Sequence, residues 1–286
     1  MLITSDKDVR RQLMALRGSE YRGSRVLSSY PRVPQPLASQ WIARWKRAHP
    51  STTPVESADI SKGLWAVINN AGINSVGPVE IVTMQMFQRC AEVNLFGPIR
   101  VTKSVLPLIR QAQGRVINVT SERAFNPRAQ SAPYCLAKSG LTIFSDCLSR
   151  EMSEFKVKVI TVVPGEFAGA TSIVKPEIAE GLQDRLLQAQ ASLSLQDQQA
   201  VLYSKDNIET MVKSFQGAME LSGTSCEPVI QAYIDAVLNA DPLSCYLVHG
   251  FKRQCLDPYI LLVRCRPFVP ECLMHTVEKI LFFLLK

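Results

Sequence analysis

The chain has 286 residues, of which 47% are hydrophobic and 20% are charged, and its formal net charge at pH 7 is +7. This composition is typical of a globular protein and excludes a largely disordered one, and the length suits one large α/β domain or two small ones. No apolar run approaches the roughly 18 residues of a membrane-spanning helix. The N-terminus also lacks the apolar core of a signal peptide.

The cysteines and the basic residues do not define a site of their own. None of the eight cysteines forms Cys-x-x-Cys, and the three histidines are scattered, so we expect no metal site and, by default, a reduced compartment. Basic residues cluster in the first fifty positions, for example at Arg44-Trp45-Lys46-Arg47. A solvated helix face is the favoured interpretation. The alternatives are an anionic lipid surface or nucleic acid, but no recognised nucleic-acid motif accompanies the cluster, so we expect no nucleic-acid partner.

Residues 1–62 do not show the start of a dinucleotide-binding fold. Such a fold opens with a strand, a Gly-rich turn and a helix whose N-terminus binds the pyrophosphate. The early glycines, Gly18, Gly23 and Gly63, are not spaced as Gly-x-x-x-Gly-x-Gly. We therefore expect residues 1–62 to be an irregular remnant of a cofactor-binding half.

From Gly63 onward, apolar strands alternate with amphipathic helices. Strands are predicted at 64–68, 116–119, 156–163 and 245–249, and helices at 83–93, 96–111, 132–155 and 227–239. This alternation predicts an α/β fold with a doubly wound, mostly parallel sheet, Rossmann-like but N-terminally truncated. We expect the core to span 63–250, with a substrate lid at about 166–222. The apolar tail, 251–286, is either a helix packed on the body or a membrane-surface patch.

Ser121, Tyr134 and Lys138 carry the clearest chemistry. Ser121 follows a predicted strand, and Pro133 suits the first turn of a helix that places Tyr134 and Lys138 on one face. A free phenol has a pKa near 10, too high for a base at neutral pH, but a neighbouring ammonium lowers it. A serine hydroxyl can hold a substrate oxygen beside the phenol. Such a set could move a proton on or off a carbinol oxygen while a cofactor takes or gives hydride.

Ser121 followed by Tyr134-x-x-x-Lys138 resembles the active site of the short-chain dehydrogenase/reductase family. Two more motifs occur in the family's order, Asn69-Asn70-Ala71-Gly72 after the first strand and Pro164-Gly165 after the third. The resemblance covers roughly residues 60–250. It implies that Ser121, Tyr134, Lys138 and Asn94 are catalytic, that Ser121 also binds substrate, and that Asn94 supports a water relaying protons to the lysine.

The resemblance also implies NAD as cofactor, with NADP not excluded. The residues it places against the cofactor are Asn69, Ala71, Gly72, Tyr134, Lys138, Pro164 and Gly165. Asp6 would lie where NAD enzymes of the family place an acidic residue on the ribose. The family often has a threonine three residues after the Pro-Gly, but here Ala168 occupies that position and Thr171 lies further on.

Within the family, three stretches are most similar to the branch that interconverts 3-hydroxybutyrate and acetoacetate at the mitochondrial inner membrane. They are Gly63-Leu64-Trp65, Phe144-Ser145-Asp146-Cys147-Leu148 and Phe167-Ala168-Gly169-Ala170-Thr171-Ser172. This branch implies a small-molecule substrate, a homo-oligomer and possible membrane contact through the tail. A small anionic substrate needs a cation, for which Lys175, Arg123 and Arg128 are candidates.

Two alternatives remain open. The branch that acts on 11β-hydroxysteroids and retinol shares the catalytic set, and it implies large apolar substrates and the endoplasmic reticulum membrane. The other alternative is a non-catalytic relic that cannot bind NAD, since no Gly-rich loop was found to hold the pyrophosphate.

Overall fold

The structure is a computed structural model, and its described residues fall in several separate stretches. They are 2–3, 63–80, 82–171, 173, 181, 184, 222–250, 257–270, 273–274, 276–277 and 280. The predicted remnant therefore lies outside the described residues except for Leu2–Ile3, as do most of the predicted lid and the last residues of the tail.

Within the described residues, five strands form one sheet in the order β1-β2-β3-β4-β5. They are β1 Leu2–Ile3, β2 Ala66–Asn69, β3 Arg115–Val119, β4 Lys158–Pro164 and β5 Cys245–Val248. The strands β2 to β5 run parallel, and β1 pairs antiparallel with β2. Parallel neighbours require crossover connections, and helices occupy those between β2, β3 and β4.

The helices begin and end close to the positions that the hydrophobic periodicity indicates. They are α3 Met84–Ala91, the π-helical η2 Glu92–Phe96, α4 Gly97–Gln111, α5 Ala132–Met152, α9 Glu227–Leu238 and α10 Pro258–Cys265. Short 3₁₀ turns occur at η3 Glu122–Ala124, η4 Ser153–Phe155, η5 Ala168–Ala170 and η7 Arg266–Phe268. The side chain of Thr83 caps α3 by accepting from the Met86 N–H, which is a common helix start.

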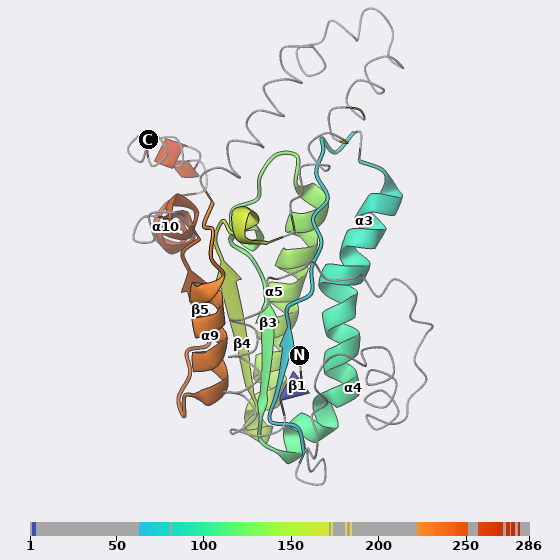
Figure 1. Cartoon of the computed structure of the whole chain (residues 1–286), viewed down its shortest axis with the longest axis vertical. Helices are drawn as coiled ribbons and strands as arrows, with labels where there is room; N and C mark the ends of the chain where they lie inside the picture. Colours follow the sequence, from blue (N-terminus) through green and yellow to red (C-terminus); the bar gives the residue numbers. More distant parts are fainter. Residues whose placement is uncertain are drawn as a thin grey trace, which may run out of the picture.

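The sheet has one hydrophobic core on each face, because successive strand side chains point to opposite sides. Val67 and Val116 pack with residues of α4 and α5, including Ile109 and Leu148. Ile68, Ile117 and Ile160 pack with the buried face of α9. Figure 1 shows α9 and α4 on opposite sides of the strands. The predicted α/β architecture with a mostly parallel sheet is thus confirmed.

Two side chains tie the end of α9 to the sheet. Arg115 donates to the carbonyls of Ala236 and Asn239, both at 2.6 Å, and Trp65 Nε1 donates to Val237 at 3.0 Å. The last carbonyls of a helix have no partner within it, and the helix dipole favours a cation there. The guanidinium also lies 4.9 Å from the Trp65 ring centroid.

The described part of the tail packs on the body through α10. Tyr259, Ile260 and Leu262 are buried, whereas Phe268, just after the helix, is 85% exposed. Among the described residues, no helix is both long and apolar enough to cross a membrane. The apolar run at 281–286 lies outside the described residues.

Candidate active site

The candidate site lies at the edge where the parallel strands β2, β3 and β4 end. Asn70-Ala71-Gly72 follows β2, Ser121 comes two residues after β3, and Gly165 directly follows β4. Ligands of open α/β sheets bind outside the carboxyl ends of the strands. Three of the predicted motifs therefore share one edge, although they are far apart in the sequence.

Helix α5 brings the predicted tyrosine and lysine to this edge. Pro133 lies in its first turn, as the sequence indicates. Lys138 is 3% exposed, and its Nζ donates to the Val119 carbonyl at 2.7 Å. The same Nζ lies 5.7 Å from the centroid of the Tyr134 ring. The last carbonyl of β3 thus orients the ammonium beside the phenol.

Ser121 lies against the phenol of Tyr134. Burial raises the pKa of Tyr134 above its usual value, and hydrogen bonding with the Ser121 side chain opposes that rise. Burial also lowers the pKa of Lys138 to about 8. The sequence predicts that the ammonium lowers the pKa of the phenol below its ordinary value. In the structure the effect of burial dominates instead, and the Lys138 ammonium donates to the Val119 carbonyl.

Asn94 is fully buried within the π-helical turn η2. Its side-chain oxygen accepts from the Ile73 N–H at 2.9 Å, and its nitrogen donates to the Ile73 carbonyl at 2.8 Å. The paired contacts fix the backbone just after Gly72. Single π-turns within helices often mark functional sites. The sequence placed Asn94 between two helices but did not predict the π geometry.

Gly72, Asn94 and Lys138 lie close together. A Cβ built on Gly72 would be 3.3 Å from Asn94 Oδ1 and 3.7 Å from Lys138 Nζ. The missing side chain thus leaves room beside a buried amide and an ammonium. An ammonium has three donors, and the Val119 carbonyl uses one of them. These polar groups fit a ligand that carries hydroxyl groups, such as the ribose of a nicotinamide cofactor.

Asn69 and Asn70 have different partners. Asn69 Nδ2 donates to Thr102 Oγ1 at 3.0 Å and to Asn118 Oδ1 at 2.8 Å, so both of its N–H groups are used inside the protein. Asn118 in turn donates to Ser145 Oγ at 2.8 Å. Asn70 Oδ1 accepts from the Tyr233 hydroxyl of α9 at 2.7 Å. The side chain of Asn69 therefore joins β2, α4 and β3, and this leaves the backbone of the motif, including Ala71, to meet a ligand.

Pro164 ends β4, and Gly165 lies against α10. A Cβ on Gly165 would fall 2.1 Å from Asp257 Oδ2, so this position requires glycine for packing. Further on, Ala168 is buried in η5. The Thr171 hydroxyl donates to the Phe167 carbonyl at 3.0 Å, so this donor is used within its own turn.

The predicted cations differ in their surroundings. Arg123 forms ion pairs with Glu122 (Nε–Oε1, 3.0 Å) and Glu166 (Nη2–Oε2, 3.3 Å). Arg128 lies 4.3 Å from the ring centroid of Tyr259. Lys175 and Asp6 lie outside the described residues. The arginine nearest to Ser121 is thus paired with two carboxylates.

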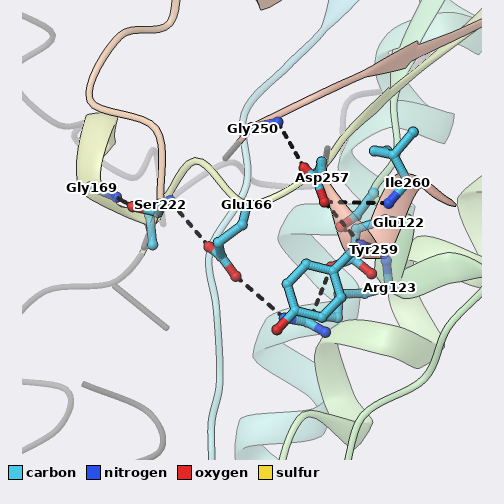
Figure 2. Close-up of polar contacts among 11 residues, drawn as sticks. Glu122, Arg123, Glu166, Gly169, Ser222, Gly250, Asp257, Tyr259 and Ile260 are labelled. Carbon is cyan, nitrogen blue, oxygen red and sulfur yellow. Dashed lines mark hydrogen bonds and ion pairs between the residues drawn. The ribbon is translucent and has the colours of Figure 1, made fainter. Parts of the chain in front are cut away.

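Sequence reasoning missed the polar cluster beside Ser121, which Figure 2 shows. Its members are Glu122, Arg123, Glu166, Asp257 and Tyr259. Asp257 is fully buried, and its carboxylate accepts from the N–H groups of Gly250, Tyr259 and Ile260. One signal was available, since an Asp directly before a Pro is a typical helix start. The partners of Arg123 have no comparable signal.

The chain is also similar to known proteins. The family model for short chain dehydrogenases matches residues 52–180. Rat mitochondrial D-beta-hydroxybutyrate dehydrogenase (Rattus norvegicus) is 36% identical over 188 residues, covering 66% of this chain and 53% of that protein. Estradiol 17-beta-dehydrogenase 2 of Mus musculus is 32% identical over 65% of this chain and 47% of that protein. Retinol dehydrogenase 5 of Mus musculus is 39% identical over 50% and 42%.

Residues 52–180 of the chain therefore belong to the short-chain dehydrogenase family, whose members are oxidoreductases. The chain spans about half the length of the curated relatives it matches.

Proposed function

We propose that the protein is a nicotinamide-dependent dehydrogenase that interconverts a secondary alcohol and a ketone. One observation carries this proposal: Ser121, Tyr134 and Lys138 meet at the carboxyl edge of a parallel sheet, with the Ser121 side chain beside the phenol. Bound NAD or NADP would accept or supply the hydride, and Lys138, Gly72 and Gly165 are the residues we expect at its nicotinamide end.

Each residue of the set has a separate role in this proposal. Tyr134 takes the proton from the carbinol oxygen during oxidation and returns it to the ketone oxygen during reduction. Ser121 holds that oxygen beside the phenol. Lys138 favours the phenolate by its charge and holds the ribose by its remaining N–H donors. Asn94 fixes the backbone after Gly72 and, with Lys138, borders the path by which protons leave.

For the substrate, we propose 3-hydroxybutyrate and acetoacetate. The similarity to D-beta-hydroxybutyrate dehydrogenase over two thirds of this chain supports this choice. The carboxylate of such a substrate needs a cation. Arg123 is the least suited, because Glu122 and Glu166 already neutralise it. Arg128 and Lys175 are the other candidates from the sequence for this cation. A mitochondrial location, membrane contact through the tail and a homo-oligomeric state belong to the same proposal.

The second candidate is a neutral, apolar alcohol such as a steroid or retinol, with a location at the endoplasmic reticulum membrane. The specific observation in its favour is the neutralised Arg123, since a site with no net positive charge beside Ser121 suits an uncharged substrate. Relatives that are named for estradiol and retinol also match this chain.

The test is a comparison of substrates with the purified 286-residue chain. We expect reduced nicotinamide to form faster from D-3-hydroxybutyrate than from cortisol, estradiol or retinol at equal concentrations. The L-enantiomer is the matched control, because it has the same charge and size. Faster turnover of the steroid or of retinol would replace the first candidate by the second. No turnover with any of these alcohols, with NAD or NADP, would contradict the proposed function.

A further inference from the structure

The side chain of Arg123 joins three segments that are far apart in the sequence. It pairs with Glu122 of η3 and with Glu166 of the loop after β4, and it lies 4.9 Å from the ring centroid of Tyr259 in α10. Figure 2 shows Glu166 reaching toward Arg123, with Tyr259 beside them. The Arg123 side chain is 11% exposed. Arg suits such a position, because its planar fork can hold several acceptors and stack on a ring.

The backbone of the same residue holds Ser121. The Arg123 N–H donates to Ser121 Oγ at 3.2 Å, in the arrangement by which a serine caps the turn η3. A hydroxyl has one donor and two acceptor positions. Once one acceptor position is used by Arg123, the O–H can turn toward Tyr134 or a substrate oxygen. The position of the serine oxygen therefore depends on a residue that two other segments anchor.

Helix α10 is itself held by contacts with neighbouring segments. Asp257 at its start accepts from the N–H groups of Gly250 and Tyr259 and packs directly on Gly165. Asn126, in the loop after η3, donates to the Tyr259 carbonyl at 3.0 Å. The loop that carries Ser121 is thus held by α10 at two points, the ring and the carbonyl of Tyr259.

We propose that Arg123 is a positioning residue, which holds Ser121 in place against Tyr134 by cross-linking the loops after β3 and β4 to α10. The inference rests on the proposed function. It assigns Arg123 a role other than binding a substrate anion, in agreement with its two carboxylate partners.

The cluster also sets the charge around the phenol. Glu122 and Glu166 disfavour the phenolate and raise the pKa of Tyr134, whereas Arg123 lowers it. The other ionisable groups close to this site lie on the neighbouring elements. They are Arg128 before α5, Asp257 and Tyr259 of α10, and Cys135 and Lys138 of α5 itself. Glu122 and Arg123 are adjacent in sequence but act on the phenol with opposite signs.

Because Glu122 and Arg123 shift the pKa of Tyr134 in opposite directions, their substitutions can be compared. The variants are Arg123→Met, which removes the charge, Arg123→Lys, which keeps it without the fork, and Glu122→Gln, which keeps the shape. Lys158→Met is the matched control, because Lys158 forms an exposed ion pair with Asp241 and lies at the first residue of β4, away from the site. The readouts are kcat, KM, cofactor affinity by fluorescence, and the pH dependence of kcat/KM for alcohol oxidation.

We expect Arg123→Met to lower kcat by about 10²-fold, the scale of a misplaced reacting group, with cofactor affinity within about twofold of wild type. Its pH profile should move to higher pH, and that of Glu122→Gln to lower pH. Arg123→Lys should keep the wild-type pH profile and recover part of kcat. Lys158→Met should match the wild type in every readout.

Two results would overturn the inference. If the wild type is active but Arg123→Met keeps its kcat and pH profile, or if both variants move the profile in the same direction, Arg123 does not position the site. If the wild type oxidises no alcohol, the proposed function fails and the inference fails with it. Thermal unfolding identifies a variant that does not fold. Arg123→Lys, which keeps the charge without the fork, then decides the question, because an unchanged kcat in that variant would overturn the inference.

Discussion

Two buried polar clusters flank the end of β3, and they differ in charge and in completeness. The first cluster, below the edge, is neutral and consists of Asn69, Thr102, Asn118 and Ser145. The amide of Asn69 donates to Thr102 and Asn118, and the amide of Asn118 donates to Ser145. At the edge, the Glu122–Arg123–Glu166 cluster is charged. There, among the described residues, Glu122 Oε2 has no hydrogen-bond partner.

The difference separates a cluster that stabilises the fold from one that serves the site. A satisfied neutral network joins strands and helices, and its energy does not depend on pH. A buried ion pair is a weak source of stability, because desolvation offsets much of its attraction. The pKa of Glu122 is raised to about 7 by burial, although Arg123 opposes the rise. Perturbed ionisable groups of this kind cluster at functional sites.

The largest effect is expected at Tyr134, which the charged cluster adjoins. Tyr134→Phe should lower turnover by at least about 10²–10⁴-fold, because it removes the group that transfers the proton. Cofactor binding should remain close to wild type, since the ring stays in place. Stopped assays and fluorescence titration measure the two quantities. A variant that keeps most of the wild-type rate would contradict the assignment of Tyr134 as the acid–base group.

The next effect concerns the neutral network. Asn118→Ala removes one acceptor from Asn69 and one donor to Ser145, and leaves a buried N–H without its partner. We expect the free energy of unfolding to fall by about 2–4 kcal/mol, from two lost hydrogen bonds and one unsatisfied group. Urea unfolding at pH 5.5 and 7.5 should give the same loss, because the network contains no ionisable group.

Ser104→Ala is the control for this prediction. Ser104 donates only to the Val101 carbonyl within α4, so its removal should cost under about 1 kcal/mol. An equal loss from both variants would mean that the network adds nothing beyond a single hydrogen bond.

The strands, the helices and the Tyr134–Lys138 pair were easier to anticipate from the sequence than either polar cluster. The apolar runs before Asn69 and Ser121 predict buried strands, and the spacing of Tyr134 and Lys138 on one helix follows from local geometry. Arg123 and Glu166 are 43 residues apart, and only the parallel pairing of β3 and β4 brings them together.

The raised pKa of Tyr134 was also not evident from the sequence. The sequence shows Lys138 near Tyr134 but not the loss of solvent around the phenol, so it could not show that burial would outweigh the ammonium. The Ile73 backbone, which pairs with the Asn94 side chain, likewise reaches it from another segment.

The smallest effect is expected from Glu122, and it concerns the free energy of unfolding. This effect should depend on pH, whereas the effect of Asn118→Ala should not. The pKa of this carboxyl is about 7 in the folded protein, against an ordinary 4.5. Between these values the unfolded chain has lost the proton that the folded protein keeps. The free energy of unfolding of the wild type should therefore fall as the pH rises from 4.5 to 7, by no more than about 3 kcal/mol.

Glu122→Gln removes this titration while retaining a similar shape and a polar group beside Arg123. We expect the variant to unfold with nearly the same free energy as the wild type at pH 4.5. At pH 7.5 it should be more stable, because the wild type must then bury a charge that Arg123, shared with Glu166, compensates only in part. Urea unfolding of both proteins across this range measures the difference. A difference in free energy of unfolding between the two proteins that stays constant with pH would mean that Glu122 is charged in the folded protein throughout this range. The two clusters would then differ in their hydrogen-bond and ion-pair partners but not in their pH dependence.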